Sequence, residues 1–149
     1  MAAEPHNPKI DAIARDCIGR RVRTLGRVVT RIYDDALRPC GLTVGQLNIL
    51  VAAAKMGLAQ PAKVCKVLQM DASTLSRTID RMKDNGWVEV VEGDDARAQP
   101  FRLTAAGRRM LDRAIPAWEA AQREARNLFG PEGEALLRKA AEALAKGPR

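Results

Sequence analysis

The stretch that decides the fold reads Asp71-Ala72-Ser73-Thr74-Leu75-Ser76-Arg77-Thr78-Ile79-Asp80-Arg81-Met82-Lys83-Asp84-Asn85-Gly86. Asp71 is a candidate helix N-cap, and Gly86 ends the helix. Leu75, Ile79 and Met82 recur at helical spacing and form one apolar side. The opposite side carries hydroxyl and charged groups at Ser73, Ser76, Arg77, Asp80 and Arg81, with Thr74 beside them. The sequence therefore predicts a helix anchored by one face and polar on the other.

This polar face suits a DNA major groove. The groove is about 12 Å wide and admits a helix, Arg can bind guanine O6 and N7, and Ser and Thr suit either class of base. The simpler interpretation is a solvated face on which Asp80 and Asp84 pair with Arg77, Arg81 or Lys83.

Upstream of this helix the sequence predicts a helix-turn-helix. A short helix starts at Gln60-Pro61 and has Val64, Val67 and Leu68 as its apolar face, followed by a three-residue turn. Before it, Thr43 and Gln46 have the spacing of a capping box, and Gly57 closes the helix that they start. The side chains expected to face the core from that helix are Leu47, Leu50, Val51 and Ala54.

Downstream, the pattern changes from helix to strand. Residues 87–91 are strand-like, residues 93–95 are turn-like, and residues 101–103 can return as the partner strand. A hairpin directly after a helix-turn-helix indicates a winged helix. Arg97 lies near the tip, where it can enter a narrow minor groove or pair with Asp94 or Asp95.

Long helices are expected on both sides of this part. Residues 9–37 carry an apolar seam at helical spacing, and Pro39 and Gly41 end that helix. The seam consists of Ile18, Val22, Leu25, Val29, Ile32 and Ala36, with Arg20, Arg21, Arg23, Arg27 and Arg31 off it. A second helix runs from Thr104 to about residue 128, kinked at Pro116, and an amphipathic helix follows the break at Gly130-Pro131. Two chains would bury these surfaces mutually.

Composition and charge exclude several classes of function. The chain has 149 residues and a net charge of +7, which favours a polyanionic partner over a charge that serves solubility alone. Aromatic residues make up 3 %, too few for domains that stack bases. The spacing of Cys17, Cys40, Cys65 and the single histidine, His6, predicts no metal site, and we expect no cofactor and no enzyme activity. No apolar run reaches the roughly 18 residues of a membrane span, so we expect a soluble, cytoplasmic protein that does not bind membranes.

Several short motifs in this order resemble the MarR family of bacterial winged-helix transcription regulators. They are Leu42-Thr43, Ser73-Thr74-Leu75-Ser76-Arg77, Asn85-Gly86-Trp87-Val88, Asp95-Ala96-Arg97 and Leu103-Thr104-Ala105-Ala106-Gly107. The resemblance implies a mainly helical fold with a small hairpin wing. It implies one domain over residues 1–149, with a winged helix-turn-helix at 42–107 and dimerisation helices at 9–38 and 108–147.

The resemblance also implies a function: a homodimer, expected to be a repressor, that binds a pseudo-palindromic double-stranded DNA operator. The predicted DNA-binding residues are Ser73, Thr74, Ser76, Arg77, Arg81, Arg97, Lys63 and Gln60. Asp95 would brace the wing, although the acidic residues before Arg97 depart from the usual basic wing. A small aromatic ligand between the dimerisation helices and the winged helix would release the DNA.

Two alternatives remain open from the sequence. Cys17 suggests a redox-sensing branch of the same family, with Arg20 and Arg21 near the thiol, against the simpler role of a small core residue. The acidic wing would also suit a winged helix that binds another protein. Linear dependence of log affinity on log salt with duplex DNA distinguishes the DNA-binding hypothesis from that module.

Overall fold

The computed structural model describes residues 7–93 and 99–147 of the chain. The elements follow in the order α1 (Pro8–Asp16), α2 (Ile18–Leu37), a 3-10 turn (Arg38–Cys40), α3 (Val44–Met56), α4 (Pro61–Leu68), α5 (Ala72–Asp84), β1 (Val88–Val90), β2 (Phe101–Leu103) and α6 (Ala105–Ala145). The two strands form one antiparallel sheet in which Glu89 lies opposite Arg102. This arrangement confirms the predicted mainly helical fold with a small hairpin.

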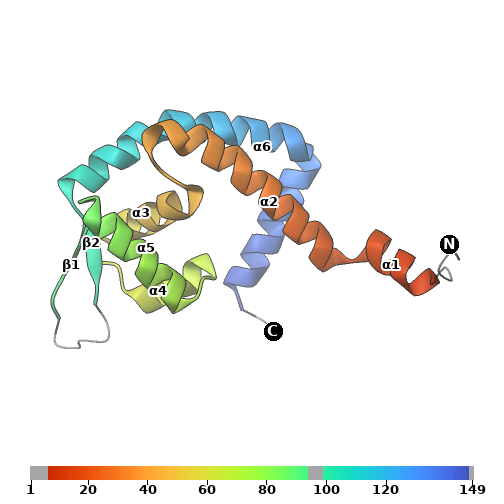
Figure 1. The fold of residues 1–149 in the computed structure, drawn as a ribbon, viewed down its shortest axis with the longest axis horizontal. Helices are drawn as coiled ribbons and strands as arrows, with labels where there is room; N and C mark the ends of the chain where they lie inside the picture. The colour runs from red at the N-terminus through yellow and green to blue at the C-terminus, as the bar shows by residue number, and fades with distance from the viewer. Residues whose placement is uncertain (1–6, 94–98, 148–149) are drawn as a thin grey trace, which may run out of the picture.

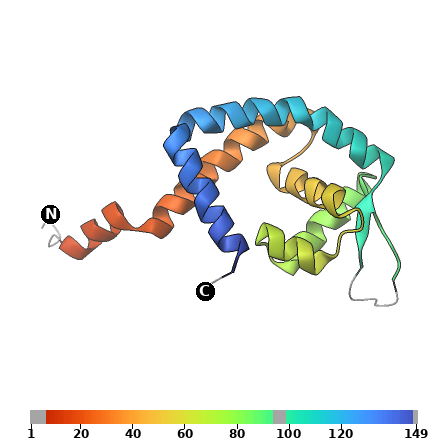
Figure 2. The same ribbon diagram turned by 180° about the vertical axis from the view of Figure 1, so that it is seen from behind.

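The long helices form an arch over the smaller elements. α2 packs along α6, and α3, α4, α5 and the hairpin lie beneath them (Figure 1). α1 projects from the body at the end far from the hairpin. Seen from behind, the last part of α6 turns back across α2 (Figure 2). The chain thus separates a helix-turn-helix with its hairpin from a layer of long helices.

The core lies mainly within the smaller elements. Side chains from α3, α4, α5 and both strands pack into one cluster, and Leu37 and Ala114 join it from the long helices. Its largest fully buried side chains are Phe101, Leu37, Ile49, Leu50, Leu75, Met82, Val64 and Val88. Since this core holds α5 and the strands in place, it fixes how the polar face of α5 is presented.

The start of α3 confirms the predicted capping box. The Thr43 hydroxyl accepts from the Gln46 amide at 3.2 Å, and the Gln46 side-chain oxygen accepts from the Thr43 amide at 3.0 Å. Gly57 ends the helix at φ +70°. The predicted inward face was partly wrong. Leu47 and Leu50 are buried, as expected. Val51 and Ala54 are exposed, and Ile49, Ala52 and Ala53 are buried in their place. α3 packs against α2, α4, α6 and β2 at once, so its buried surface is wider than one stripe.

The predicted single helix over residues 9–37 was wrong, because the chain breaks at Cys17. This residue has extended dihedrals, φ −63° and ψ 109°, and separates α1 from α2. Its amide donates to the Ile13 carbonyl at 3.2 Å, while its Sγ accepts from the Arg20 amide at 3.4 Å. Cys17 therefore caps both helices. No residue of α1 is buried, so no core packing opposes the break.

α6 begins at the predicted cap and leaves helical geometry at the predicted break, Gly130-Pro131. Thr104 caps its first turn by accepting from the Gly107 amide at 3.0 Å. The backbone leaves helical geometry at Gly130, with φ +67° and ψ 173°, directly before Pro131. A kink was also predicted at Pro116, but this residue lies inside the helix where the dihedrals stay helical, so it causes no break like the one at Gly130. The change of direction of α6 is therefore placed at Gly130-Pro131.

Candidate nucleic-acid interface

α4 and α5 form the expected helix-turn-helix. Gln60 is the N-cap residue of α4 and Pro61 its first residue, where the missing amide proton costs no helical hydrogen bond. Gln69 turns the chain at φ +50°. Val64 anchors α4 in the core, but Val67, predicted on the same face, is 64 % exposed. The turn thus fixes α5 against α4, and one side of α4 stays open to solvent.

α5 is held from beneath by the three apolar residues that the spacing predicts. Leu75, Ile79 and Met82 are all buried. Among the exposed residues of the opposite side are Ser73, Ser76, Arg77, Asp80 and Arg81. The structure therefore brings the predicted DNA-reading side chains of α5, with half-buried Thr74 next to them, to one rigid helix.

The N-terminus of α5 engages two of these side chains. The hydroxyl of Ser73 donates to Asp71 at 2.6 Å and that of Thr74 at 2.7 Å, while the Thr74 amide donates at 2.8 Å. These bonds, with the Ser73 hydroxyl contributing most, hold the pKa of Asp71 well below its usual range. Ser73 and Thr74 keep their oxygen lone pairs, so in this conformation they offer acceptors to a base.

Arg77 and Arg81 are not held by the helix itself. Within residues 7–93 and 99–147, the ion pairs of the structure involve neither guanidinium, so the pairing with Asp80 or Asp84 considered above is absent there. Ser76 borders a cavity between α4, α5 and the hairpin, together with Asp80. Arg77 and Arg81 are thus exposed cations on the outer face of the helix.

The two predicted contacts on α4 differ in exposure. Lys63 is exposed in the first turn of α4, where its ammonium can reach a phosphate. Gln60 is half-buried, and its side chain makes no capping bond to the helix. Both side chains belong to the helix-turn-helix, but neither lies on the outer face of α5.

The hairpin is anchored on its inner side. Val88, Phe101 and Leu103 are buried, and Phe101 pairs through its backbone with Ala59, with N···O distances of 2.8 and 3.0 Å. On the outer side, Arg102 Nε donates to Glu89 Oε1 at 2.6 Å, so this arginine is already paired. Asp95, the predicted brace, and Arg97, the predicted minor-groove residue, lie outside the described residues, as does Asp94.

One junction, which the sequence motifs do not reveal, joins α5, the hairpin and α6. The Thr104 hydroxyl donates to the Gly86 carbonyl at 2.6 Å, and the Thr104 amide donates to the Trp87 carbonyl at 3.1 Å. A Cβ atom on Gly107 would lie 2.0 Å from the same Trp87 oxygen. Only glycine fits there. The two motifs at 85–88 and 103–107 therefore meet in space.

The predicted redox residue sits between α1 and α2. Cys17 is half-buried, and its Sγ caps α2 as described above. Tyr33, the one tyrosine of the chain, lies far along α2, where its hydroxyl donates to Gln122 Oε1 of α6. Burial raises the pKa of this tyrosine. The structure thus engages Tyr33 elsewhere, and a redox role for Cys17 stays a prediction.

Three further features of the chain concern its cysteines, metal binding and membranes. Cys17, Cys40 and Cys65 are all free thiols. Within residues 7–93 and 99–147, no three His, Cys, Asp or Glu side chains gather closely enough to hold a metal ion. Among the same residues, no helix combines the length and the apolar character that crossing a membrane requires.

Comparison with known proteins finds similarity to one family of regulators. A family model described as MarR family matches residues 41–98. The HTH-type regulator YwoH of Bacillus subtilis is 29 % identical over 84 residues, covering 56 % of this chain and 61 % of that protein. The multiple antibiotic resistance protein MarR of Escherichia coli is 29 % identical over 91 residues, covering 60 % and 63 %. The chain thus spans about three fifths of the length of these two relatives.

A solved structure matches over a larger share of the chain. The Mycobacterium tuberculosis transcriptional regulator MOSR, in complex with DNA, has a TM-score of 0.75 at 29 % identity and covers 88 % of this chain and 98 % of its own. The names of these relatives agree with the prediction that the chain is not an enzyme. The winged helix, the order of the motifs and these relatives together support a MarR-family regulator.

Proposed function

We propose that the chain is a transcription repressor that binds a pseudo-palindromic operator as a homodimer. The outer face of α5 carries this proposal, because Arg77 and Arg81 are exposed and unpaired within the described residues on a helix anchored from beneath. Guanidinium groups in this setting can bind guanine edges or phosphates. MOSR, similar over most of this chain, was solved in complex with DNA, which supports the same use of the fold.

Exposed apolar side chains support the dimer. On α2, Ile18, Val22 and Leu25 are exposed, although they continue the seam that α6 partly covers further along. Near the end of α6, Leu136, Leu137 and Leu144 are exposed as well. Burying such side chains contributes about 1.5–3 kcal/mol each. A second copy of the chain would cover both surfaces and present two α5 helices to a two-fold symmetric site.

Selection of bound duplexes from a random pool tests the proposal. The expected result is a consensus sequence with two-fold symmetry. The logarithm of the affinity for duplexes of this sequence should fall linearly with the logarithm of the salt concentration. The slope should be steep, because a dimer carries twice the +7 charge of one chain. Absence of duplex binding at low salt would contradict it and would favour the protein-binding module.

Release by a small aromatic ligand is the regulatory part of the proposal. A ligand that prefers a dimer with the wrong spacing of its α5 helices must lower DNA affinity by the same factor by which DNA lowers ligand affinity. Repeating the selection with a panel of phenols and aromatic acids would show a loss of bound duplex. Equal recovery with and without every compound would remove the ligand from the proposal.

The wing is tested separately. Arg97→Ala should lower affinity most where the flanking DNA is rich in A and T, because the minor groove is narrow and strongly negative there. Affinity measured on operators with A/T-rich and G/C-rich flanks checks this. Equal losses on both would assign Arg97 to phosphate contact, and no loss would take the wing out of DNA recognition.

A further inference from the structure

Two hydroxyl groups at the start of α5 have their protons held within the chain. The Ser73 hydroxyl donates to Asp71 Oδ1 at 2.6 Å, and the Thr74 hydroxyl donates to Asp71 Oδ2 at 2.7 Å. The lowered pKa of Asp71 keeps its carboxyl ionised at neutral pH, and an ionised carboxylate can only accept hydrogen bonds. The direction of both bonds is therefore fixed, with the hydroxyls as donors and the carboxylate as acceptor.

This direction restricts which base edges the two hydroxyls can bind. A free serine or threonine hydroxyl both donates and accepts, so the sequence alone leaves either class of base open. A hydroxyl whose proton is held by a carboxylate offers only its lone pairs. In the major groove, adenine and cytosine present amino-group donors at N6 and N4, whereas guanine and thymine present acceptors. Ser73 and Thr74 therefore suit adenine or cytosine.

The bonds to Asp71 are strong enough to persist when a base edge approaches. A hydrogen bond from a hydroxyl to an ionised carboxylate is short and about twice as strong as one between neutral groups. Asp71 Oδ1 also accepts from the Thr74 amide at 2.8 Å as the N-cap of α5, so the helix itself holds the carboxylate in place. A negative charge is favoured at this end of a helix. The neutral acceptors of guanine and thymine thus compete poorly with the carboxylate for the two protons.

The next turn of α5 has the opposite hydrogen-bonding character. Arg77 is exposed on the same face, and none of the ion pairs within residues 7–93 and 99–147 involves its guanidinium. A guanidinium only donates, and its preferred base edge is O6 and N7 of guanine. The face of α5 therefore presents acceptors in its first turn and donors in its second.

We propose that Asp71 is a positioning residue for base recognition: by holding the protons of Ser73 and Thr74, it selects adenine or cytosine at the base pairs that these two side chains reach. This proposal rests on the proposed function, because it takes α5 as the helix that reads the operator. It adds the class of base that the first turn of α5 selects. It also assigns the selection to a residue that acts through its neighbours.

Asp71→Asn reverses one of the two bonds and keeps the cap. The amide oxygen still accepts from the Thr74 amide and the Ser73 hydroxyl, while the amide nitrogen takes the place of Oδ2 and donates to the Thr74 hydroxyl. The Thr74 proton is then free to bind guanine or thymine. Fluorescence anisotropy with the selected operator, and with operators changed at single positions, measures the effect. The wild type should favour adenine or cytosine over guanine or thymine roughly 3- to 10-fold at the Thr74 position, and Asp71→Asn should bring this ratio close to one.

Two variants of Thr74 identify that position and test the route of the effect. Thr74→Val removes the hydroxyl with little change of shape, so the base pair at which it brings the ratio close to one is the pair that Thr74 reads. Asp71→Asn should change the ratio no further in the Thr74→Val background. Thr74→Ser keeps the hydroxyl and should keep the preference.

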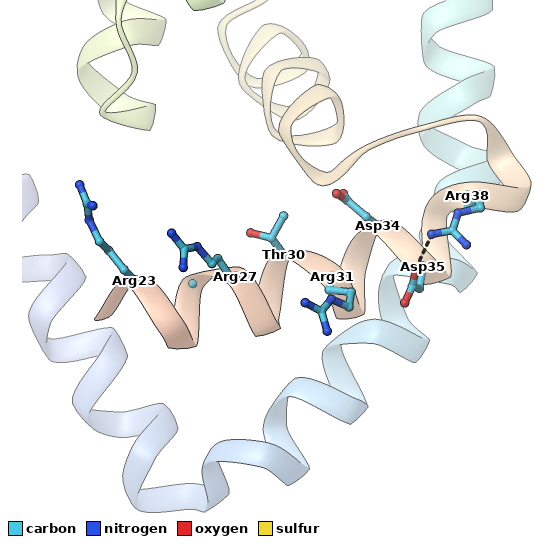
Figure 3. Close-up of a pocket in the computed structure, with 8 residues that line it drawn as sticks. Arg23, Arg27, Thr30, Arg31, Asp34, Asp35 and Arg38 are labelled. Carbon is cyan, nitrogen blue, oxygen red and sulfur yellow. Dashed lines mark hydrogen bonds and ion pairs between the residues drawn. The ribbon is translucent and has the colours of Figure 1, made fainter. Parts of the chain in front are cut away.

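Two further substitutions remove the same charge without changing these hydroxyls. Asp84→Asn does so at the last residue of α5, and Asp35→Asn does so on α2, where Figure 3 shows the carboxylate paired with Arg38. Each removes one negative charge and so shifts affinity for all duplexes alike. Neither should alter the ratio between bases at the Thr74 position.

A purely structural role of Asp71 predicts a different pattern. Asp71→Asn would then change affinity for every duplex equally and leave the ratio as it is in the wild type. That result would overturn the proposal, as would a wild-type preference for guanine or thymine at the Thr74 position, or the absence of any position that responds to Thr74→Val. In each of these cases the chain still binds its operator and the proposed function stands. Failure of the wild type to bind any duplex would instead refute the proposed function, and this proposal with it.

Discussion

The winged-helix part and the long helices differ in how completely they bury their apolar side chains. Within residues 42–107 the apolar residues of α3, α4, α5 and the strands converge on one core, and of the large apolar side chains described as exposed only Val51, Leu58 and Val67 lie there. On α1, α2 and α6, exposed apolar side chains run from Ile10 to Leu144. The winged part is complete as a single chain, whereas the long helices leave surface for another chain to cover.

The largest effect is expected where a second copy would cover the long helices. Ile18 is 74 % exposed in the single chain, and Ile18→Asp would place a charge at each of the two symmetric positions. Losing about 1.5–3 kcal/mol twice raises the dimer dissociation constant by roughly 10²- to 10⁴-fold. Sedimentation equilibrium measures this.

Val67→Asp is the matched control, because it places the same charge on an exposed apolar position of the winged part. It should leave the dimer intact. A monomeric wild-type chain at micromolar concentration, or equal dissociation of both variants, would show that the comparison between the two regions is mistaken.

The next effect concerns the close contact inside the winged part. Gly107→Ala should lower the free energy of unfolding by about 1–3 kcal/mol, because its methyl group meets the Trp87 carbonyl and the backbone must move. Urea unfolding monitored by circular dichroism checks this. Gly26→Ala is the control: it meets open space on α2 and should stabilise the helix by about 0.5–1 kcal/mol. If both substitutions changed stability alike, the junction would have no special role.

DNA contacts sharpen the contrast between exposed and engaged arginines. Arg77→Ala should cost about 1–3 kcal/mol of operator affinity and relax base preference if its guanidinium contacts a guanine. Equal losses on all duplexes would instead indicate a phosphate contact. Arg102→Ala should cost less, because Glu89 already pairs with that guanidinium at 2.6 Å. Fluorescence anisotropy with operator and scrambled duplexes separates these outcomes, and a larger loss for Arg102→Ala would reverse the assignment.

The smallest effect concerns the cap of α5. Because the folded pKa of Asp71 lies below its unfolded value, the stability from this ionised cap is present above the usual aspartate range. It is lost as pH falls through the folded pKa. Asp71→Asn keeps a cap that does not titrate. Urea unfolding between pH 7 and pH 2 should show the wild type losing its advantage over Asp71→Asn on acidification, and a constant difference would contradict this.

Local patterns predicted most of the elements because their causes are local. The Thr43–Gln46 capping box, the Asp71 cap and the turn at Gly86 each depend on neighbouring residues, and all three are present. The break at Cys17 escaped prediction, because the apolar seam starts only at Ile18 and gives no information about the residues before it. The prediction that Val67 faces the core was wrong for another reason. Apolar spacing shows which residues share one side of a helix. How many of them are buried depends on the elements that pack against that helix.

The candidate site was likewise predictable from the sequence only in part. The sequence identified Arg77, Arg81 and Ser76 as one face, since helical spacing alone places them together. It could not show that Ser73 and Thr74 donate to Asp71, because that depends on side-chain rotamers at the helix start. The arginines of α2 were visible off the seam, but only the structure shows that Asp34 binds the Val44 amide and that Asp35 pairs with Arg38.

The sequence alone determined the order of helices and strands, the two faces of α5 and the apolar excess of the long helices, because spacing along one chain dictates which residues share a helix face. Only the tertiary structure decided that residues 85–88 and 103–107 meet at one junction and that Tyr33 binds Gln122. Those contacts join segments distant in the chain. Their geometry follows from how the whole core packs, which no local pattern encodes.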